Sequence, residues 1–302
     1  MKIKVKIIRI VFGLFRLVSN LKDDFKYNFK VYINHINPDY KSEDLLLSRI
    51  KTKAHILDKG LNMTPFQIGR SKSAYINVKN LIKDYDKKFS NPKIDSSYSW
   101  ACNIVKTYEK KQINPNINVS SQNKILKNPS LEKLIKERVS IRNFTHKIIN
   151  KTDWLKIVEC AMSAPSSCHR QPANYYIVSK KELKDILLSC IAGSTGFANG
   201  IPYLVIVTSD IRAYNINDRH TYLVDTSLSV NSFILGCKAF GVGSTIMNWS
   251  HATNRQNKTV KKVLGITNNE KIVTTIACGY PNFLPHKPKS MNPSKKAKFY
   301  VD

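Results

Sequence analysis

A short run of alternating polar side chains at residues 138–142 is the part of this sequence best suited to chemistry. It reads Arg138-Val139-Ser140-Ile141-Arg142, and alternate side chains of an extended backbone point to the same side. Two guanidinium groups and a hydroxyl on one side suit a phosphate monoester, because arginine binds phosphate oxygens through two parallel hydrogen bonds. The same spacing also occurs on ordinary solvated surfaces, so this run alone does not establish a phosphate site.

Two further segments have residue types that suit contact with a polar ligand. Residues 161–172 (AMSAPSSCHRQP) predict a helix that runs into a Pro-Ser-Ser turn, which exposes the amides and hydroxyls of Ser166 and Ser167. Residues 225–244 (DTSLSVNSFILGCKAFGVGS) predict a buried helix followed by Gly-x-Gly, and glycine allows backbone to approach a ligand closely. A helix-to-strand loop and a core helix with its turn explain these two segments equally well.

The elements that must position these residues alternate along the carboxy-terminal two thirds of the chain. The patterns predict helices at residues 131–138, 152–163, 182–190, 222–240 and 257–264, and strands at 174–179, 203–208, 244–249 and 272–278. Gly241 is placed to end the longest helix as a left-handed cap. This alternation favours an α+β fold with a central mixed sheet flanked by helices. Neither G-x-G-x-x-G nor a Walker loop is present, which argues against a Rossmann or P-loop site.

The first 110 residues are predicted to form a basic helical region. Apolar residues recur at helical spacing from residue 42 to 85, Gly60 is placed to end a first helix, and a second is expected at 73–89. His55 and Asp58 are three apart on the first helix, where a structural role is expected for the pair. Residues 111–130 are rich in Asn, Ser and Pro and are predicted to be a linker to a domain at 131–302.

The large positive charge of the chain does not by itself identify a partner. There are 49 Lys+Arg and 21 Asp+Glu, a formal net charge of +28, which attracts phosphates, nucleic acid or anionic lipid. Lysine dominates and asparagine and isoleucine are abundant, which is typical of a low-GC genome, so we expect no nucleic-acid partner. The six cysteines have no C-x-x-C spacing, and we expect no metal site and no disulfide framework.

The first twenty residues form the most apolar stretch and leave two interpretations open. On a helix, Lys2, Lys6, Arg9, Gly13, Arg16 and Asn20 share one stripe. Such a helix would either pack against its own domain or a dimer partner, or lie on an anionic membrane surface. The uninterrupted apolar run is too short to span a bilayer. We therefore expect a cytoplasmic protein, with peripheral membrane contact through residues 1–20 as an alternative.

Taken together and in order, these segments resemble the nitroreductase family of FMN-dependent oxidoreductases. The resemblance rests on SIRNF (140–144), APSSCHRQP (164–172), FGVGS (240–244), GYP (279–281) and KPK (287–289), and it covers residues 131–302. It implies a nitroreductase-like sandwich, preceded here by the additional helical region. Two positions depart from the family pattern: His169 stands where asparagine is frequent, and Val139 stands where a basic residue is frequent.

The resemblance also implies a set of FMN-binding residues. Arg138, Ser140 and Arg142 would hold the phosphate and ribityl groups, Ser166, Ser167 and Gln171 would contact the flavin, and Gly243 and Ser244 would offer backbone near the ring. Lys287, or its neighbours His286 and Lys289, would complete the phosphate clamp, although the family usually has an arginine in that stretch. Tyr214, Phe197 and Trp249 are candidates to cover the exposed ring face.

The expected reaction needs no catalytic protein side chain, because hydride passes through N5 of the flavin. The resemblance implies a ping-pong reaction with NAD(P)H as donor and a small organic acceptor, in a homodimer with FMN at the subunit interface. One alternative is a specialised biosynthetic flavin dehydrogenase or oxidase that acts directly on its substrate. Another, from a different class, is a membrane-surface or nucleic-acid-binding protein that keeps a degenerate flavin fold.

Overall fold

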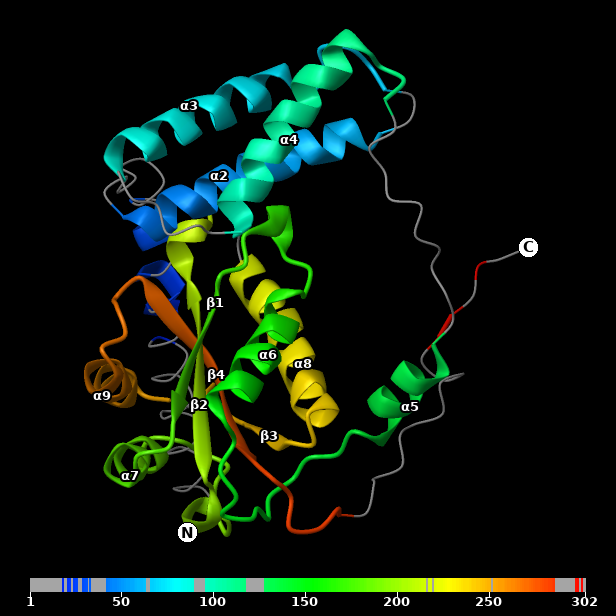
Figure 1. Cartoon of the computed structure of the whole chain (residues 1–302). Coiled ribbons are helices and arrows are strands. Elements are labelled where there is room, and N and C mark those ends of the chain that lie inside the picture. The colour runs from blue at the N-terminus through cyan, green and yellow to red at the C-terminus, as the bar shows by residue number, and fades with distance from the viewer. Residues whose placement is uncertain are drawn as a thin grey trace.

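The computed structural model describes residues 42–63, 66–89, 96–117, 128–215, 217–218, 220–250 and 252–285, with scattered positions within 18–33 and 297–300. Figure 1 shows three helices lying across one end of a body that is built from a sheet with helices on both sides. Residues 1–17 and 286–290 lie outside the described residues, and with them most of the amino-terminal stripe and the proposed clamp residues Lys287 and Lys289. None of the described helices is long and apolar enough to cross a membrane.

The amino-terminal helices form a small bundle with its own apolar core. They are α2 (Glu43–Leu61), α3 (Lys72–Lys88) and α4 (Ser96–Ile113), and fully buried Leu46, Leu57 and Tyr85 lie between them. The sequence patterns did not predict α4 as a separate helix, and its last residues enter the segment expected to be a linker.

Gly60 does not end α2, so this prediction was wrong. The helix continues to Leu61, and its C-cap is Asn62, which has a φ of −94° rather than a left-handed one. A Cβ on Gly60 would lie 2.4 Å from Oγ of Ser71, the residue just before α3. The glycine is needed for close packing of the α2–α3 connection, and side-chain periodicity does not reveal that need.

The four named strands pair antiparallel in the order β1-β2-β4-β3. They are β1 (Ala173–Val178), β2 (Tyr203–Asp210), β3 (Gly243–Met247) and β4 (Glu270–Gly279). A mixed sheet was predicted, but within the described residues parallel pairing is limited to an isolated bridge between Ser140 and Ser244. The α+β class is confirmed, and the strands lie close to their predicted positions.

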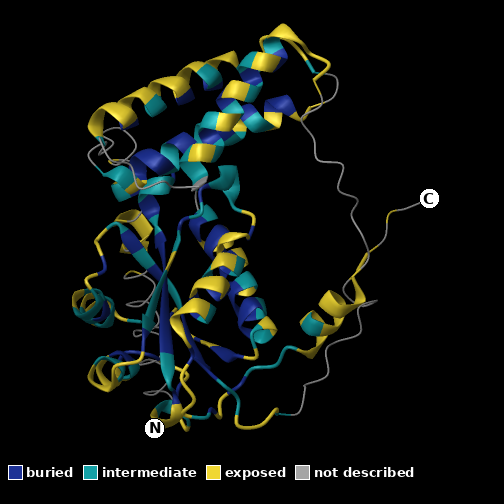
Figure 2. Ribbon diagram, viewed as in Figure 1, coloured by how far each residue is buried: buried dark blue, intermediate teal, exposed yellow. Residues whose placement is uncertain are grey.

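Helices cover both faces of the sheet because strand side chains alternate in direction. On one face, Val205 and Val207 of β2 pack with α6 (Lys151–Met162) and α8 (Thr221–Ala239). On the other, Leu204 and Ile206 pack with α7 (Lys181–Ser189) and α9 (Asn254–Leu264). Figure 2 shows the strands as mostly buried, whereas the helices alternate between buried and exposed faces. Gly241 has a φ of +70° just after α8, as a left-handed cap requires.

Candidate functional site

The segment that carries Arg138, Ser140 and Arg142 runs beside the start of β3. The Ile141 amide donates to the Ser244 carbonyl at 3.0 Å, and Ser140 forms its parallel bridge with the same residue. Farther along, the Thr145 amide donates to the Tyr280 carbonyl at 2.8 Å. Backbone pairing therefore brings three segments that are distant in sequence, 138–145, 243–244 and 279–282, to one end of the sheet.

A cavity of about 230 Å³ lies at this meeting point. Its lining includes Arg138, Lys238, Gly243, Ser244 and Leu284. Within the described part of the chain, neither Arg138 nor the exposed Arg142 has a hydrogen bond or ion pair. Lys238, in the last turn of α8, was not identified from the sequence, although it lies one turn before the cap at Gly241. This end of the protein can accept an anion.

Gly243 has a packing reason to be glycine. A Cβ there would lie 2.8 Å from Cγ1 of Ile141, which fills the space where a side chain would stand. The close approach of the two backbones places Ser140 against Ser244. The sequence suggested Gly243 as a point of approach for a ligand, and the structure shows that the segment bearing the arginines approaches it.

The Pro-Ser-Ser turn is built around a buried carboxylate of α8. The turn continues into η1 (Ser167–His169), and the Ser167 amide donates to Oδ1 of Asp225 at 2.9 Å. The other carboxylate oxygen accepts from the Tyr214 hydroxyl at 2.9 Å. Burial and the adjacent Asp225 raise the pKa of Tyr214, so its hydroxyl stays protonated and keeps donating. The Ser166 hydroxyl accepts from the Gln171 amide at 3.0 Å.

Three residues of this turn that are not glycine have left-handed backbone. Cys168, His169 and Gln171 have φ values of 50°, 54° and 48°. Each such residue costs roughly 1–2 kcal/mol and persists only where its surroundings hold it. Part of that support comes from the helical region: Nζ of Lys51 donates to Oε1 of Gln171 at 3.1 Å.

Aromatic contacts from the helical region hold the same turn. The rings of His55 and His169 stack with centroids 6.3 Å apart, and Trp100 meets His169 edge-on at 5.5 Å. Burial, with Lys51 and His55 nearby, lowers the pKa of His169, which favours the neutral imidazole. His55 therefore packs against the Pro-Ser-Ser turn at His169, a role that its spacing from Asp58 did not reveal.

The predicted site residues fall into two groups within one protomer. Arg138, Ser140, Gly243 and Ser244 gather at the carboxy-terminal end of α8, and Arg142 follows on the same segment. Ser166, Ser167 and Gln171 lie at the other end, where Asp225 holds the turn. From Asp225 to Lys238 is 13 residues of one helix, or about 20 Å. Of the aromatic candidates, Tyr214 is buried beneath Arg170 and Trp249 is buried in the core, so neither presents an exposed ring face.

Known proteins resemble this chain over residues 135–280. A family model described as the nitroreductase family matches residues 135–195 and 191–280. A relative from Archaeoglobus fulgidus, whose assigned name is NADH dehydrogenase/NAD(P)H nitroreductase, is 24% identical over 149 residues, or 49% of this chain and 84% of that protein.

Solved structures show the same fold. A protein of Bacteroides thetaiotaomicron, also named as an NADH dehydrogenase/NAD(P)H nitroreductase, is 20% identical with a TM-score of 0.51, and the match covers 58% of this chain and 99% of that one. A protein of Desulfovibrio desulfuricans named as a nitroreductase, solved in complex with FMN, is 19% identical with a TM-score of 0.50, and the match covers 59% and 100%. Residues 135–280 of this chain therefore belong to the nitroreductase family.

Proposed function

We propose that this protein is an FMN-dependent oxidoreductase that uses NAD(P)H as donor and a small organic molecule as acceptor. The observation that carries the proposal is the anion-accepting end of the domain, where Arg138 and Lys238 line a cavity beside Ser140 and Arg142. The residues present fit FMN, because its phosphate needs positive charge and hydroxyl or amide donors. The names of relatives in the family, NAD(P)H nitroreductase and a nitroreductase bound to FMN, support the same activity.

The protein's part in this chemistry is to bind and orient. FMN, when bound, accepts and donates hydride at its ring, in alternate half-reactions with the donor and the acceptor. We assign Arg138, Ser140, Arg142 and Lys238 to the phosphate end, and Gly243 and Ser244 to the side of the ring. Ser166, Ser167 and Gln171 would contact the flavin through the Pro-Ser-Ser turn, with Lys287 or Lys289 as a further phosphate ligand. The thiols are free, which suits the cytoplasm, where NAD(P)H is supplied.

A second copy of the chain would complete this site, because one protomer holds the two groups at opposite ends of α8. The homodimer that we propose would cover apolar side chains that one protomer leaves exposed. On α8, Val224 is 58% and Leu228 is 41% exposed, and α5 (Pro129–Glu137) exposes Leu131 and Ile135 and has no buried residue. An apolar helix surface of this kind is normally covered by another element.

We expect light scattering to give the native protein twice its chain mass of 34.5 kDa. Val224→Lys places a charge on the proposed interface and should give a monomer that no longer retains FMN. Ile186→Lys is the matched control, because Ile186 is 43% exposed on α7, which covers the other face of the sheet. A native protein that is monomeric with FMN bound would contradict the shared site.

The activity is tested by flavin content and reduction. We expect purified protein to be yellow, to contain one FMN for each chain, and to be bleached anaerobically by NADPH or NADH. Bound FMN that neither nucleotide reduces would instead indicate a dehydrogenase or oxidase reduced directly by its own substrate. Protein that stays colourless after incubation with FMN would contradict the enzyme proposal and would favour the alternative of a degenerate flavin fold.

We also propose that the contact with an anionic membrane expected through residues 1–20 extends to residues 18–31. Four apolar side chains at helical spacing are 55–70% exposed: Val18, Leu21, Phe25 and Phe29. Exposed Lys22 and Lys26 accompany this stripe. Val31 is buried on the opposite side, and Nζ of Lys30 donates to the Asn268 carbonyl, so the segment is attached to the second domain with its apolar stripe outward. Basic residues beside an apolar stripe are typical of interfacial helices.

Flotation with phosphatidylglycerol vesicles tests this contact. We expect the full chain to float with the vesicles. The Phe25→Glu/Phe29→Glu double variant should stay at the bottom of the gradient, because two rings that would enter the membrane interface are replaced by charges. Ile113→Glu is the control, since Ile113 is 86% exposed on α4. Equal flotation of the Phe25/Phe29 double variant and the control would show that the stripe is not the contact.

A further inference from the structure

A cleft separates the helical region from the nitroreductase domain. One cavity of about 400 Å³ lies between α2, α3 and the segment around η3 (Ile211–Ala213). A second cavity, of about 590 Å³, shares Ser48, Arg170 and Arg212 with the first and reaches Gln171 at the Pro-Ser-Ser turn. The second cavity thus adjoins the first and extends to the turn proposed to contact the flavin.

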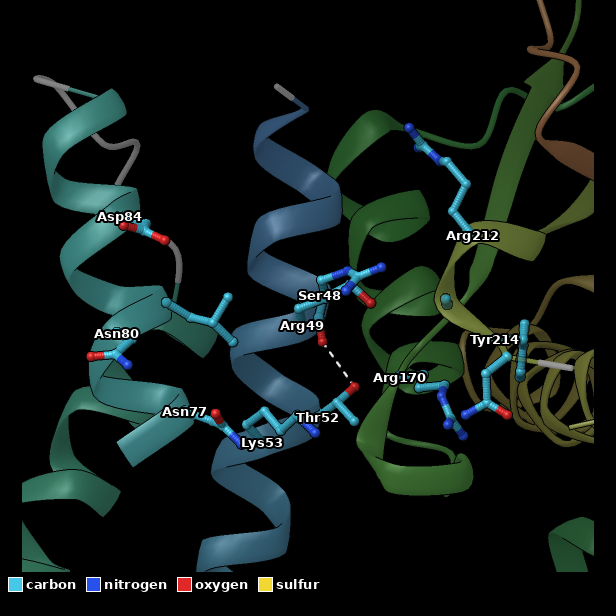
Figure 3. A pocket seen from close by; sticks show the side chains of 13 residues that line it. Ser48, Arg49, Thr52, Lys53, Asn77, Asn80, Asp84, Arg170, Arg212 and Tyr214 are labelled. Atoms are coloured by element: carbon cyan, nitrogen blue, oxygen red, sulfur yellow. Dashed lines mark hydrogen bonds between the residues drawn. The ribbon is translucent and has the colours of Figure 1, made fainter. Parts of the chain in front are cut away.

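The first cavity carries a small excess of positive charge, and its cations come from both walls. Arg49 and Lys53 extend from α2, Arg170 and Arg212 come from the nitroreductase domain, and Asp84 of α3 is the one carboxylate of the lining (Figure 3). Arg212 is held by Asp210, and Arg170 by Asp218 at 3.0 Å. Counting these two carboxylates as well, the cavity has four cations and three anions, a formal excess of one positive charge.

Two cations of this cavity have donors without a partner in the described part of the chain. Within the described residues, Lys53 has neither a hydrogen bond nor an ion pair. Arg170 is only 7% exposed, and its buried Nε has no hydrogen-bond partner among the described residues. An unsatisfied buried donor on a cation costs more than 1 kcal/mol, so such an atom indicates a missing acceptor.

Neutral donors complete the lining. Asn77 and Asn80 of α3 and Thr52 of α2 line the same cavity as Lys53. Amide and hydroxyl groups donate to the oxygens of an anion without adding charge. The helical region thus supplies eight of the thirteen residues that line the cavity.

We propose that the cleft binds the anionic end, a phosphate or carboxylate group, of the molecule that exchanges electrons with the flavin. Lys53, Arg49 and Arg170 are its ligands, and the helical region is the wall that selects it. The assignment to an electron donor or acceptor rests on the proposed function, whereas the anion site itself does not. The proposal gives the helical region a function: it adds substrate selection to a domain whose proposed phosphate site lies at the other end of α8.

Calorimetric titration of the FMN-loaded protein with inorganic pyrophosphate at low ionic strength tests the site. We expect Lys53→Gln to weaken binding by about three- to tenfold, because it removes one charge-assisted contact. Asp84→Asn should strengthen binding by roughly two- to fivefold, because it removes the carboxylate of the lining. Misfolding cannot produce this second effect. Lys59→Gln, which makes the same charge change on an exposed turn of α2 outside the cleft, should leave binding unchanged.

Two results would overturn the site: no binding of pyrophosphate to the native protein, or equal binding to the Lys53→Gln and Lys59→Gln variants. Steady-state kinetics of the Lys53→Gln variant then show whether the electron donor or the acceptor carries the anionic group. A raised KM for NADPH or NADH assigns the anion to the donor, and a raised KM for the acceptor alone assigns it to the acceptor. Flavin that cannot be reduced would contradict the proposed function, while the calorimetric result would still stand.

Discussion

Replacing Arg138 and Arg142 together by alanine will lower the affinity for FMN by about a hundredfold or more. Each guanidinium can form charge-assisted hydrogen bonds to the phosphate, worth about 1.5–3 kcal/mol each, and 1.4 kcal/mol corresponds to a tenfold change in affinity. The native fold should survive, because neither arginine holds another described residue through a hydrogen bond or ion pair. The measurement is the dissociation constant of FMN, obtained from quenching of its fluorescence.

Riboflavin makes this test specific for the phosphate. It has the same ring and ribityl chain as FMN but no phosphate, so the native protein should bind it far more weakly than FMN. The double variant should bind FMN and riboflavin with nearly equal affinity. Arg255→Ala, which removes an exposed arginine of α9 on the other face of the sheet, should keep the native preference. If the double variant still prefers FMN as strongly as the native protein does, other residues bind the phosphate.

The fold of the second domain was predictable because its signals are local. The strand at 203–210 begins with a run of apolar residues of strong β propensity, and α8 is a long, largely buried helix followed by a glycine cap at Gly241. The antiparallel order of the strands was not predictable in this way. Pairing partners are set by contacts between residues far apart in sequence, such as Ser244 with Cys278.

The sequence could predict which residues belong to the candidate site, but it could not predict how they are arranged in space. Alternation placed Arg138, Ser140 and Arg142 together, but nothing local indicates that Lys238 would join them or that Ser167 would lie at the far end of α8. The contacts of Lys51 and His55 with the turn follow from how two separate units pack. The division of the chain into a helical region, a linker at 111–130 and a flavin domain stays a prediction.

Glu270→Ala should cost about 1–3 kcal/mol of unfolding free energy, because this buried carboxylate is the shared acceptor of several side chains. Glu270 is 7% exposed at the start of β4, and both its oxygens accept from the Tyr176 hydroxyl at 2.9 Å. Thr208, Asn174 and Thr267 also donate to it. Thr208 is buried and Tyr176 is half-buried, and a buried donor left unsatisfied costs about 1–3 kcal/mol, whereas the exposed Asn174 and Thr267 can turn to water.

The carboxylate links β4 to two other strands and to a loop, since its donors come from β1, β2 and the loop before β4. Burial and the hydrogen bond to Glu270 raise the pKa of Tyr176, so its hydroxyl remains a donor throughout the range in which the protein can be assayed. Glu270→Gln keeps one acceptor oxygen but turns an NH₂ group toward these donors, and should cost about half as much as alanine. Urea denaturation followed by circular dichroism measures the loss, with Glu159→Ala on the exposed face of α6 as the control. An unfolding midpoint for Glu270→Ala equal to that of Glu159→Ala would show that the donors find water instead, and that the carboxylate does not hold the sheet edge beneath the cleft.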